Sequence, residues 1–95
     1  MMAKVGETHR IRAFFVESKV GKSGLTVTLD YTDPNGVAVT GISASAGAID
    51  GEYYYLLKFT IAGMWLYVFK TATATVDQQH LPGVIEVTQL SVYPN

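Results

Sequence analysis

The chain has 95 residues, of which 48% are hydrophobic and only 16% are charged, and its net charge is −1. This length supports one core, so residues 1–95 are predicted to form a single domain. A net charge this close to zero excludes the strong positive field that attracts a protein to nucleic acid. The fraction of charged residues is below the usual ~25%, which indicates that another molecule covers part of the surface.

Two alternating segments predict the first long strands. In Thr8–Glu17 the odd positions Ile11, Ala13 and Phe15 are apolar, and in Leu25–Tyr31 every odd position is apolar. Successive side chains of a strand point to opposite sides. Each segment is therefore expected to bury its odd positions. The segment between them, Ser18–Gly24, is rich in glycine, lysine and serine and is predicted to be a loop. A further short strand is predicted at Ala3–Val5.

A strong turn and a weaker strand come next. Asp33–Gly36 reads Asp-Pro-Asn-Gly, in which proline presets φ and Asn-Gly tolerates positive φ. The turn explains these residues better than the calcium loop that they partly match, because Ile42 occupies the position of the bidentate carboxylate. Val37–Ser45 is predicted to be an edge strand or a bulged strand, because it is rich in small residues.

The aromatic segment that follows carries most of the large side chains. Its two strands are predicted at Glu52–Ile61 and Met64–Ala72. Their inward positions are Tyr53, Tyr55, Leu57, Phe59, Trp65, Tyr67 and Phe69. The Ala62-Gly63 joint between them lacks the residues that tight hairpins prefer. We therefore expect the chain to step from one sheet to the other at this joint.

The last third of the chain supplies one more strand. Thr73–Gly83 is predicted to be irregular, Val84–Val92 to be the closing strand and Pro94-Asn95 to be a tail. No amphipathic helix is predicted, and the connections are too short for the crossovers of a parallel sheet. The expected fold class is all-β, an antiparallel β-sandwich of about seven strands.

The segment Gly63-Met-Trp-Leu-Tyr67 is similar to the start of strand F in immunoglobulin domains. Together with Asp33–Gly36 and Asp50–Tyr55, it resembles the small, cysteine-free immunoglobulin-like domains of bacterial surface proteins and tailed-phage virion proteins. Trp65 stands in place of the corner tyrosine of antibody domains, and Tyr67 in place of their second cysteine. The resemblance implies an immunoglobulin-like β-sandwich and a non-enzymatic structural or binding module, namely a phage or prophage virion-associated protein.

No combination of residues predicts a catalytic, cofactor or metal site. Gly21-Lys22-Ser23 matches the end of a phosphate-binding loop, but Val16 replaces the first glycine of that loop and a strand follows. His9 and His80 are far apart, and a zinc site would need both of them with carboxylates because the chain has no cysteine. The protein is therefore predicted not to be an enzyme and to use no cofactor.

The outward, even positions carry apolar residues where a monomeric sandwich usually has polar ones. The predicted interface consists of Phe14, Val16, Tyr54, Leu56, Met64, Leu66 and Val68. In an immunoglobulin strand order, the first four would be neighbours and would form an apolar patch, which is typical of a protein contact. The predicted function is assembly with a protein partner or as a homo-oligomer. The alternative is a small-ligand or carbohydrate-binding β-sandwich, which requires a concave aromatic face.

The loops Ser18–Gly24 and Thr73–Gly83 are predicted to be adaptable recognition elements, because loops at the end of a sandwich tolerate variation. Their candidate recognition residues are Lys19, Lys22, Asp77, Gln78, Gln79 and His80. The N-terminus lacks the apolar stretch of a signal peptide, and no apolar run approaches the ~20 residues of a membrane span. We therefore expect synthesis in the cytoplasm, a free-standing subunit, no membrane contact and a place in a virion.

Overall fold

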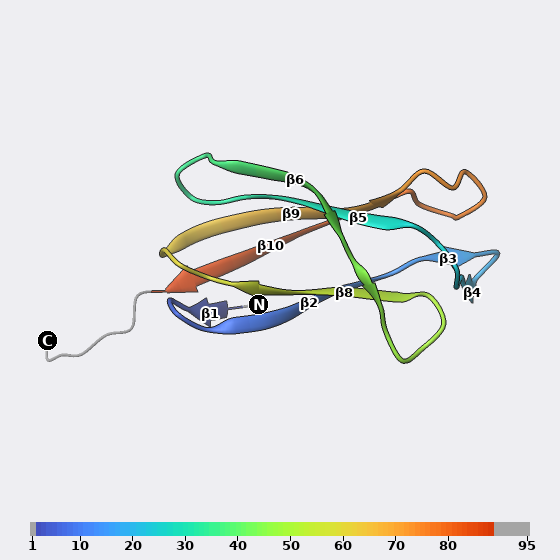
Figure 1. Cartoon of the computed structure of the whole chain (residues 1–95), viewed down its shortest axis with the longest axis horizontal. Helices are drawn as coiled ribbons and strands as arrows, with labels where there is room; N and C mark the ends of the chain where they lie inside the picture. The colour runs from blue at the N-terminus through green and yellow to red at the C-terminus, as the bar shows by residue number, and fades with distance from the viewer. Residues whose placement is uncertain (1, 89–95) are drawn as a thin grey trace, which may run out of the picture.

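The computed structural model describes residues 2–88, and these form strands and connecting loops without a helix (Figure 1). A five-stranded sheet has the order β1 (Met2–Lys4), β10 (His80–Thr88), β9 (Gly63–Thr71), β5 (Val27–Thr32) and β6 (Ala38–Ser43). A three-stranded sheet has the order β2 (Thr8–Phe14), β8 (Glu52–Lys58) and β7 (Ser45–Ala46). A separate hairpin pairs β3 (Val16–Glu17) with β4 (Val20–Gly21).

The two sheets enclose one core. In Figure 1, β5, β6 and β9 lie above β2 and β8. Five of the seven predicted inward side chains are buried, namely Tyr53, Leu57, Phe59, Trp65 and Phe69, while Tyr55 and Tyr67 are half-buried against the same cluster. The all-β class is therefore confirmed, and the two layers are consistent with the predicted β-sandwich.

The joint at Ala62-Gly63 carries the chain between the sheets, as predicted. β8 pairs with β2 in the three-stranded sheet, whereas β9 pairs with β5 and β10 in the five-stranded sheet. Gly63 has φ +130°, and a Cβ at this position would lie 2.6 Å from the Pro34 side chain. Glycine therefore satisfies both the backbone conformation and the close approach of the β5–β6 turn.

Trp65 and Phe59 bring the two layers into contact. Their rings meet edge to face with centroids 5.3 Å apart, a geometry that suits the positive edge and negative face of aromatic rings. The Trp65 indole N–H donates to the Ile61 carbonyl at 3.0 Å, so its polar group is satisfied inside the core. The alternation of odd and even positions thus predicted the buried residues correctly on both sides of the joint.

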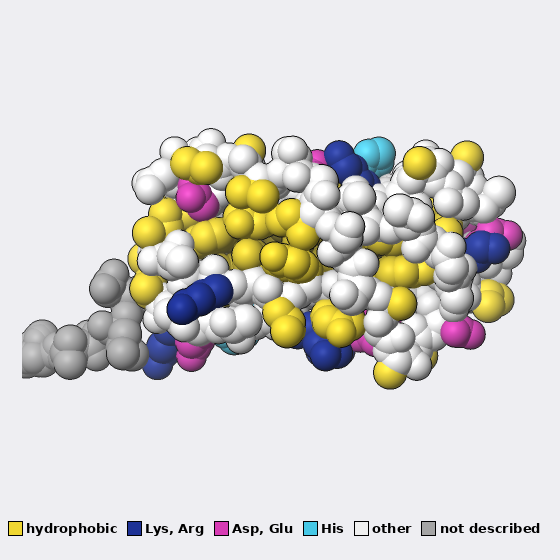
Figure 2. Space-filling view, viewed as in Figure 1, with side chains coloured by type: hydrophobic (Ala, Val, Ile, Leu, Met, Phe, Trp, Pro, Cys, Tyr) yellow, Lys and Arg dark blue, Asp and Glu magenta, His cyan; other side chains and the backbone are white. Residues whose placement is uncertain are grey.

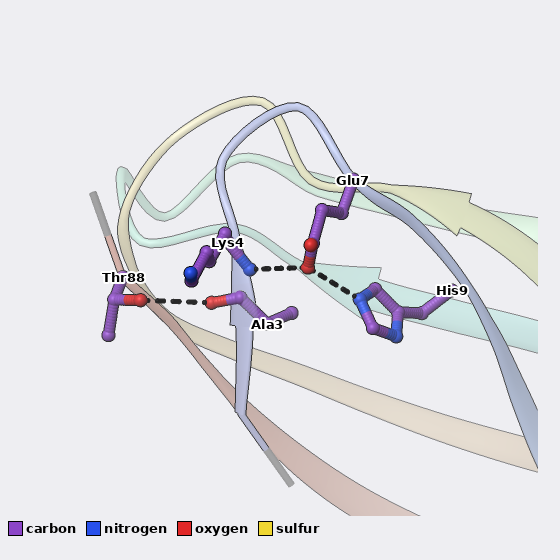
Figure 3. Close-up of polar contacts among 5 residues, drawn as sticks. All are labelled: Ala3, Lys4, Glu7, His9 and Thr88. Atoms are coloured by element: carbon purple, nitrogen blue, oxygen red, sulfur yellow. Dashed lines mark hydrogen bonds and ion pairs between the residues drawn. The ribbon is translucent and has the colours of Figure 1, made fainter. Parts of the chain in front are cut away.

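Polar contacts shown in Figure 3 join β1 to β10 and to the turn before β2. The Thr88 hydroxyl donates to the Ala3 carbonyl at 3.2 Å, next to the parallel pairing of β1 with β10. Glu7 accepts the Lys4 N–H at 2.9 Å and lies 2.9 Å from the His9 Nε2. The hydrogen bond from His9, followed by that from the Lys4 backbone, holds the pKa of Glu7 below its ordinary value. These contacts fix the turn through which the chain passes from β1 to β2.

The predicted strand Thr8–Glu17 is interrupted at Phe15. The Phe15 N–H donates to the Gly51 carbonyl at 2.8 Å, and its own carbonyl accepts the Lys22 N–H at 2.9 Å. The first bond continues the register of β2 with β8 by one residue, whereas the second directs the Phe15 carbonyl to the segment that follows β4. Val16 and Glu17 then pair with residues of the predicted loop Ser18–Gly24, which is therefore partly a strand.

The turn between β5 and β6 is confirmed, and the weak strand after it divides. The Asp33 carboxylate accepts the N–H groups of Asn35 and Val37, both at 3.0 Å, which stabilises the turn. β6 lies at the sheet edge, as predicted, and the register of its pairing with β5 shifts between Leu29 and Tyr31. The chain then leaves this sheet, so the end of the predicted strand becomes β7 in the other sheet.

β10 begins four residues before the predicted closing strand, at His80 instead of Val84. Pro82 had suggested a loop, because proline cannot donate to a ladder. In the structure it pairs with Val68 of β9, while β1 covers only residues 86–88 on the other side of β10. Pro82 therefore lies where one side of the strand is an open edge. Residues 89–92 of the predicted strand and the tail lie outside the described residues.

Strand segments number ten among the described residues, where about seven were predicted. Three of them, β3, β4 and β7, have only two residues. Short pairings of this kind leave too little periodicity in a sequence to be recognised.

Candidate interaction surface

The outer face of the five-stranded sheet carries a contiguous group of apolar side chains. The odd residues Trp65 and Phe69 of β9, and Ile85 and Val87 of β10, are buried, so the even residues of both strands face outward. The apolar patch, as we name this group, consists of Met64, Leu66, Val68, Pro82 and Val84.

Cross-strand register makes this patch continuous. Leu66 pairs directly with Val84, and Val68 pairs directly with Pro82. Met64, Leu66 and Val84 are 50%, 51% and 48% exposed, although side chains of this kind lose free energy by remaining in water. Three of the seven residues of the predicted interface thus lie together here, joined by Pro82 and Val84. These two were missing from the predicted interface because Pro82 fell in the segment predicted to be irregular, and no outward position of the predicted closing strand was included.

The same face becomes polar toward the β9–β10 loop. Lys70 lies in register between Thr28 of β5 and His80 of β10. An open hollow of about 540 Å³ lies here, lined by Thr26, Thr28, Lys70, Thr71, Ala72, Gln79 and His80. The Lys70 ammonium contacts the Asp30 carboxylate at 2.7 Å, so the basic group at this end is already paired.

Asp30 connects three strands of this sheet. Its carboxylate accepts from Lys70 of β9 and from the Gly41 N–H of β6 at 2.9 Å. The hydrogen bond from Lys70, and then that from Gly41, lowers the pKa of Asp30 from its ordinary value. Gly41 has φ +71° beside the register shift, a conformation that glycine adopts without strain.

Replacing Asp30 by asparagine tests this contact. At neutral pH the change should lower the free energy of unfolding by about 0.2–1 kcal/mol, the range for partly exposed ion pairs. Because the folded pKa of Asp30 lies below its unfolded value, the stabilisation is present above the unfolded pKa and is lost as the pH falls through the folded pKa. Urea unfolding of both proteins at neutral pH and at a series of falling acidic pH values measures it. A difference that persists in acid would contradict the assignment.

The outer face of the three-stranded sheet is different, because arginines lie among its apolar residues. Arg10 pairs across the strands with Leu56, and its guanidinium lies 4.0 Å from the centroid of the Tyr54 ring. Arg12 pairs with Tyr54 and contacts the buried Glu52 carboxylate at 3.4 Å. Both arginines occupy even positions, which face outward in this strand. The sequence therefore already indicated that charged and apolar side chains share this face.

The remaining members of the predicted interface lie near one end of that sheet. Phe14 is 47% exposed and pairs with Glu52 at the end of β2. Val16 is half-buried and belongs to β3, in the separate hairpin. The structure therefore places Phe14, Val16, Tyr54 and Leu56 on or beside one sheet but interleaves them with charged residues. A contact through these four stays a prediction.

The two predicted recognition loops meet at one end of the molecule. The Asp77 N–H donates to the Val16 carbonyl at 2.8 Å, and the Asp77 carboxylate accepts the Ser18 N–H at 3.2 Å. Lys19 has φ +68° in the β3–β4 turn, and the Lys22 ammonium lies 3.4 Å from the Glu17 carboxylate. Lys19, Lys22 and Asp77 are thus grouped by the hairpin.

The last three loop candidates lie closer to the hollow. The Gln79 side chain donates to the Thr71 carbonyl at 3.4 Å, and the Gln79 carbonyl accepts the Thr71 N–H at 3.0 Å. His80 is exposed and begins β10, and Gln78 is exposed in the loop before it. Gln79 and His80 therefore belong to the polar end of the five-stranded sheet.

Other apolar side chains reach the surface where the layers meet. Tyr31, Ile42, Tyr55 and Ile61 are half-buried and pack against the core. Figure 2 shows hydrophobic side chains in a band across the middle of this view, with most charged side chains toward its periphery. Within residues 2–88, no helix is long and apolar enough to cross a membrane. In the same residues, no group of three or more His, Cys, Asp or Glu side chains could hold a metal ion.

The chain matches no protein-family model and no curated protein sequence. A solved structure, a "putative glycoside hydrolase" from Bacteroides vulgatus ATCC 8482, contains a region similar to this chain with a TM-score of 0.63 and 13% identity. The similarity covers 95% of this chain and 16% of that protein. The chain thus corresponds to a small part of the longer protein, and at this identity the likeness concerns the fold alone.

Proposed function

We propose that this protein is a non-enzymatic structural or binding module with an immunoglobulin-like fold, and that it assembles with protein subunits through the apolar patch. The observation that carries the proposal is the pairing of Leu66 with Val84 on the outer face of β9 and β10, where both side chains are about half exposed. Contiguous exposed apolar side chains of this kind mark contact surfaces in soluble proteins.

The strand order supports the immunoglobulin-like part of the proposal. Such sandwiches place strands B, E and D in one sheet and strands G, F and C in the other, with an additional strand C′ in variable-type domains. The orders β2-β8-β7 and β10-β9-β5-β6 correspond to these two sets. The step between sheets at Ala62-Gly63 corresponds to the connection of strands E and F.

Electrostatics supports the choice of face. The outer face of the three-stranded sheet carries Arg10, Arg12 and Lys58, and solvated charges there oppose burial in an apolar contact. On the outer face of the five-stranded sheet, β9 and β10 carry charge only at their ends, at Lys70 and Glu86, and Asp30 of β5, beside Val68, is paired with Lys70. A partner can therefore cover the apolar patch without removing an unpaired charge from water at its centre.

Replacing Leu66 by aspartate should abolish concentration-dependent association, because a carboxylate at the centre of the contact would be buried without a partner. The matched control is Leu56→Asp, since Leu56 is 55% exposed on the opposite sheet and Leu66 is 51% exposed. Light scattering after size-exclusion chromatography, from about 1 µM to about 1 mM, measures both. If the wild-type chain is monomeric throughout and the two variants behave like it, the assembly proposal fails.

A virion or prophage setting, with synthesis in the cytoplasm, is part of the same proposal. It is supported by the resemblance of Gly63–Tyr67 and Asp33–Gly36 to cysteine-free phage domains. Genes for capsid or tail proteins beside the gene for this chain would support this setting. A neighbourhood of metabolic or transport genes would contradict it and leave the assembly proposal intact.

A second candidate function is the binding of a polar small molecule, for example a carbohydrate. It is favoured by the open hollow of about 540 Å³ beside Thr28, Lys70 and His80. The residues that line the hollow include no Phe, Tyr or Trp, whereas sugars commonly stack on the rings of these residues. Glycan-array binding that is lost in Thr28→Val and retained in Leu66→Asp would promote this candidate.

A further inference from the structure

We propose that the partner on the apolar patch is a second copy of this chain, packed face to face with its strands antiparallel, so that Glu86 of each copy lies opposite His80 of the other. This inference rests on the proposed function and adds the identity and orientation of the partner. It follows from how charge is distributed along β9 and β10.

The outer face of these two strands forms four successive cross-strand rows. In order along the sheet they are Met64–Glu86, Leu66–Val84, Val68–Pro82 and Lys70–His80. Neighbouring rows are two residues, or about 7 Å, apart. The two middle rows are entirely apolar on β9 and β10, and Glu86 ends the series on one side. His80 and Lys70 end it on the other side, where the Lys70 ammonium is paired with Asp30 of β5, beside Val68.

A two-fold axis that runs across the strands, between the two middle rows, makes this face complementary to itself. The axis places the Leu66–Val84 row on the Val68–Pro82 row of the second copy, so apolar side chains meet apolar side chains. It also places Glu86 on His80, and Met64 on the stem of Lys70. Each of these contacts occurs twice, as a closed isologous dimer requires.

The other face-to-face arrangement lacks this complementarity. A two-fold axis parallel to the strands, between β9 and β10, places each row on the same row of the second copy. In that arrangement β9 of one copy lies on β10 of the other. Lys70 would then face His80, and Glu86 would face Met64 without a basic partner. Charge complementarity fixes the orientation of partners more than it adds affinity, so it selects the antiparallel arrangement.

Twist and area are compatible with this dimer. Aligned sheets cross at about −30°, which shifts the end rows, ~10 Å from the axis, by about one strand spacing. A shift toward β9 brings Glu86 over Lys70, whose ammonium is paired with Asp30, and a shift toward β1 leaves Glu86 at the open edge beside His80. The five strands of the sheet have 3, 9, 9, 6 and 6 residues. At about 16 Å² per residue they give a face of about 500 Å², smaller than the ~800 Å² per partner of a standard interface and suited to a weak dimer.

Charge reversal tests the orientation directly. Glu86→Lys and His80→Glu should each weaken self-association about tenfold or more. His80→Glu sets two carboxylates opposite one another twice, and Glu86→Lys twice replaces the carboxylate that can accept a hydrogen bond from the His80 ring by an ammonium that cannot accept one. Mixing the two variants should restore association as a heterodimer, in which one contact joins the two introduced, opposite charges and the other keeps Glu86 opposite His80. Sedimentation and native mass spectrometry measure the homodimers and the mixture. Arg10→Glu, on the outer face of the other sheet, is the control and should associate like the wild type.

The outcomes separate this inference from the proposed function. If Leu66→Asp is monomeric but the charge variants associate like the wild type, or if their mixture does not recover, the antiparallel arrangement is wrong and the contact surface stands. If the wild-type chain is monomeric to about 1 mM, both fail. Glu86 and His80 are exposed, so circular dichroism should show each variant folded.

Discussion

Replacing Trp65 by alanine is expected to lower the free energy of unfolding by about 3–5 kcal/mol, the range for large buried aromatic residues. Trp65 is only 3% exposed and contacts Phe59 across the core and Tyr31 of the neighbouring strand, with ring centroids 5.3 and 5.8 Å away. Its removal leaves a cavity and also deprives the Ile61 carbonyl of the indole donor. A loss of this size is a large part of the roughly 5–15 kcal/mol that stabilises a domain.

The matched control for Trp65→Ala is Thr28→Ala. Thr28 is half-buried and lies on the outer face of the same sheet, so its replacement should change the free energy of unfolding by no more than about 0.5 kcal/mol. Urea unfolding followed by circular dichroism measures both, since tryptophan fluorescence is absent in one variant. Similar losses in the two variants would contradict the assignment of inward and outward faces.

The core could be predicted from the sequence because the alternation of inward and outward side chains is a local property of each strand. Tyr53 and Leu57, like Trp65 and Phe69, lie four residues apart along their strand, and the structure buries all four. The joint at Ala62-Gly63 was also predictable, because it lacks the residues of a tight hairpin. Both predictions depend only on residues that are close in the chain.

The candidate surface could be predicted only in part, because a surface depends on which strands are neighbours. Met64, Leu66 and Val68 were recognised as outward, but their continuity comes from the register with Pro82 and Val84. Pro82 is accepted in β10 because β1 does not extend beside it, and no local pattern reveals how far a neighbouring strand extends. The β3–β4 hairpin was missed for a similar reason, since its turn uses Ser18 and Lys19 at positive φ instead of Asn-Gly.

Gly51→Ala is expected to cost about 3–5 kcal/mol, because the residue meets two separate requirements for glycine. Gly51 has φ +92°, which an L side chain rarely adopts. A Cβ here would also lie 2.6 Å from the Phe15 carbonyl oxygen and 2.8 Å from the Gly21 Cα. Both neighbours are backbone atoms, so the clash cannot be relieved by turning a side chain. The Gly51 carbonyl meanwhile accepts the Phe15 N–H that ends β2.

Gly24→Ala separates the two requirements of Gly51. Gly24 has φ +75°, but no heavy atom lies within 4 Å of a Cβ at this position, so only the backbone strain of about 1 kcal/mol should appear. The difference between the two variants, about 2 kcal/mol or more, then measures the close packing of the turn before β8 against the β3–β4 hairpin. Equal losses in urea unfolding would mean that this packing relaxes freely. A larger loss at Gly51 would show that the hairpin is held to the sheet by backbone contact, and the hairpin in turn holds the loop that contains Asp77.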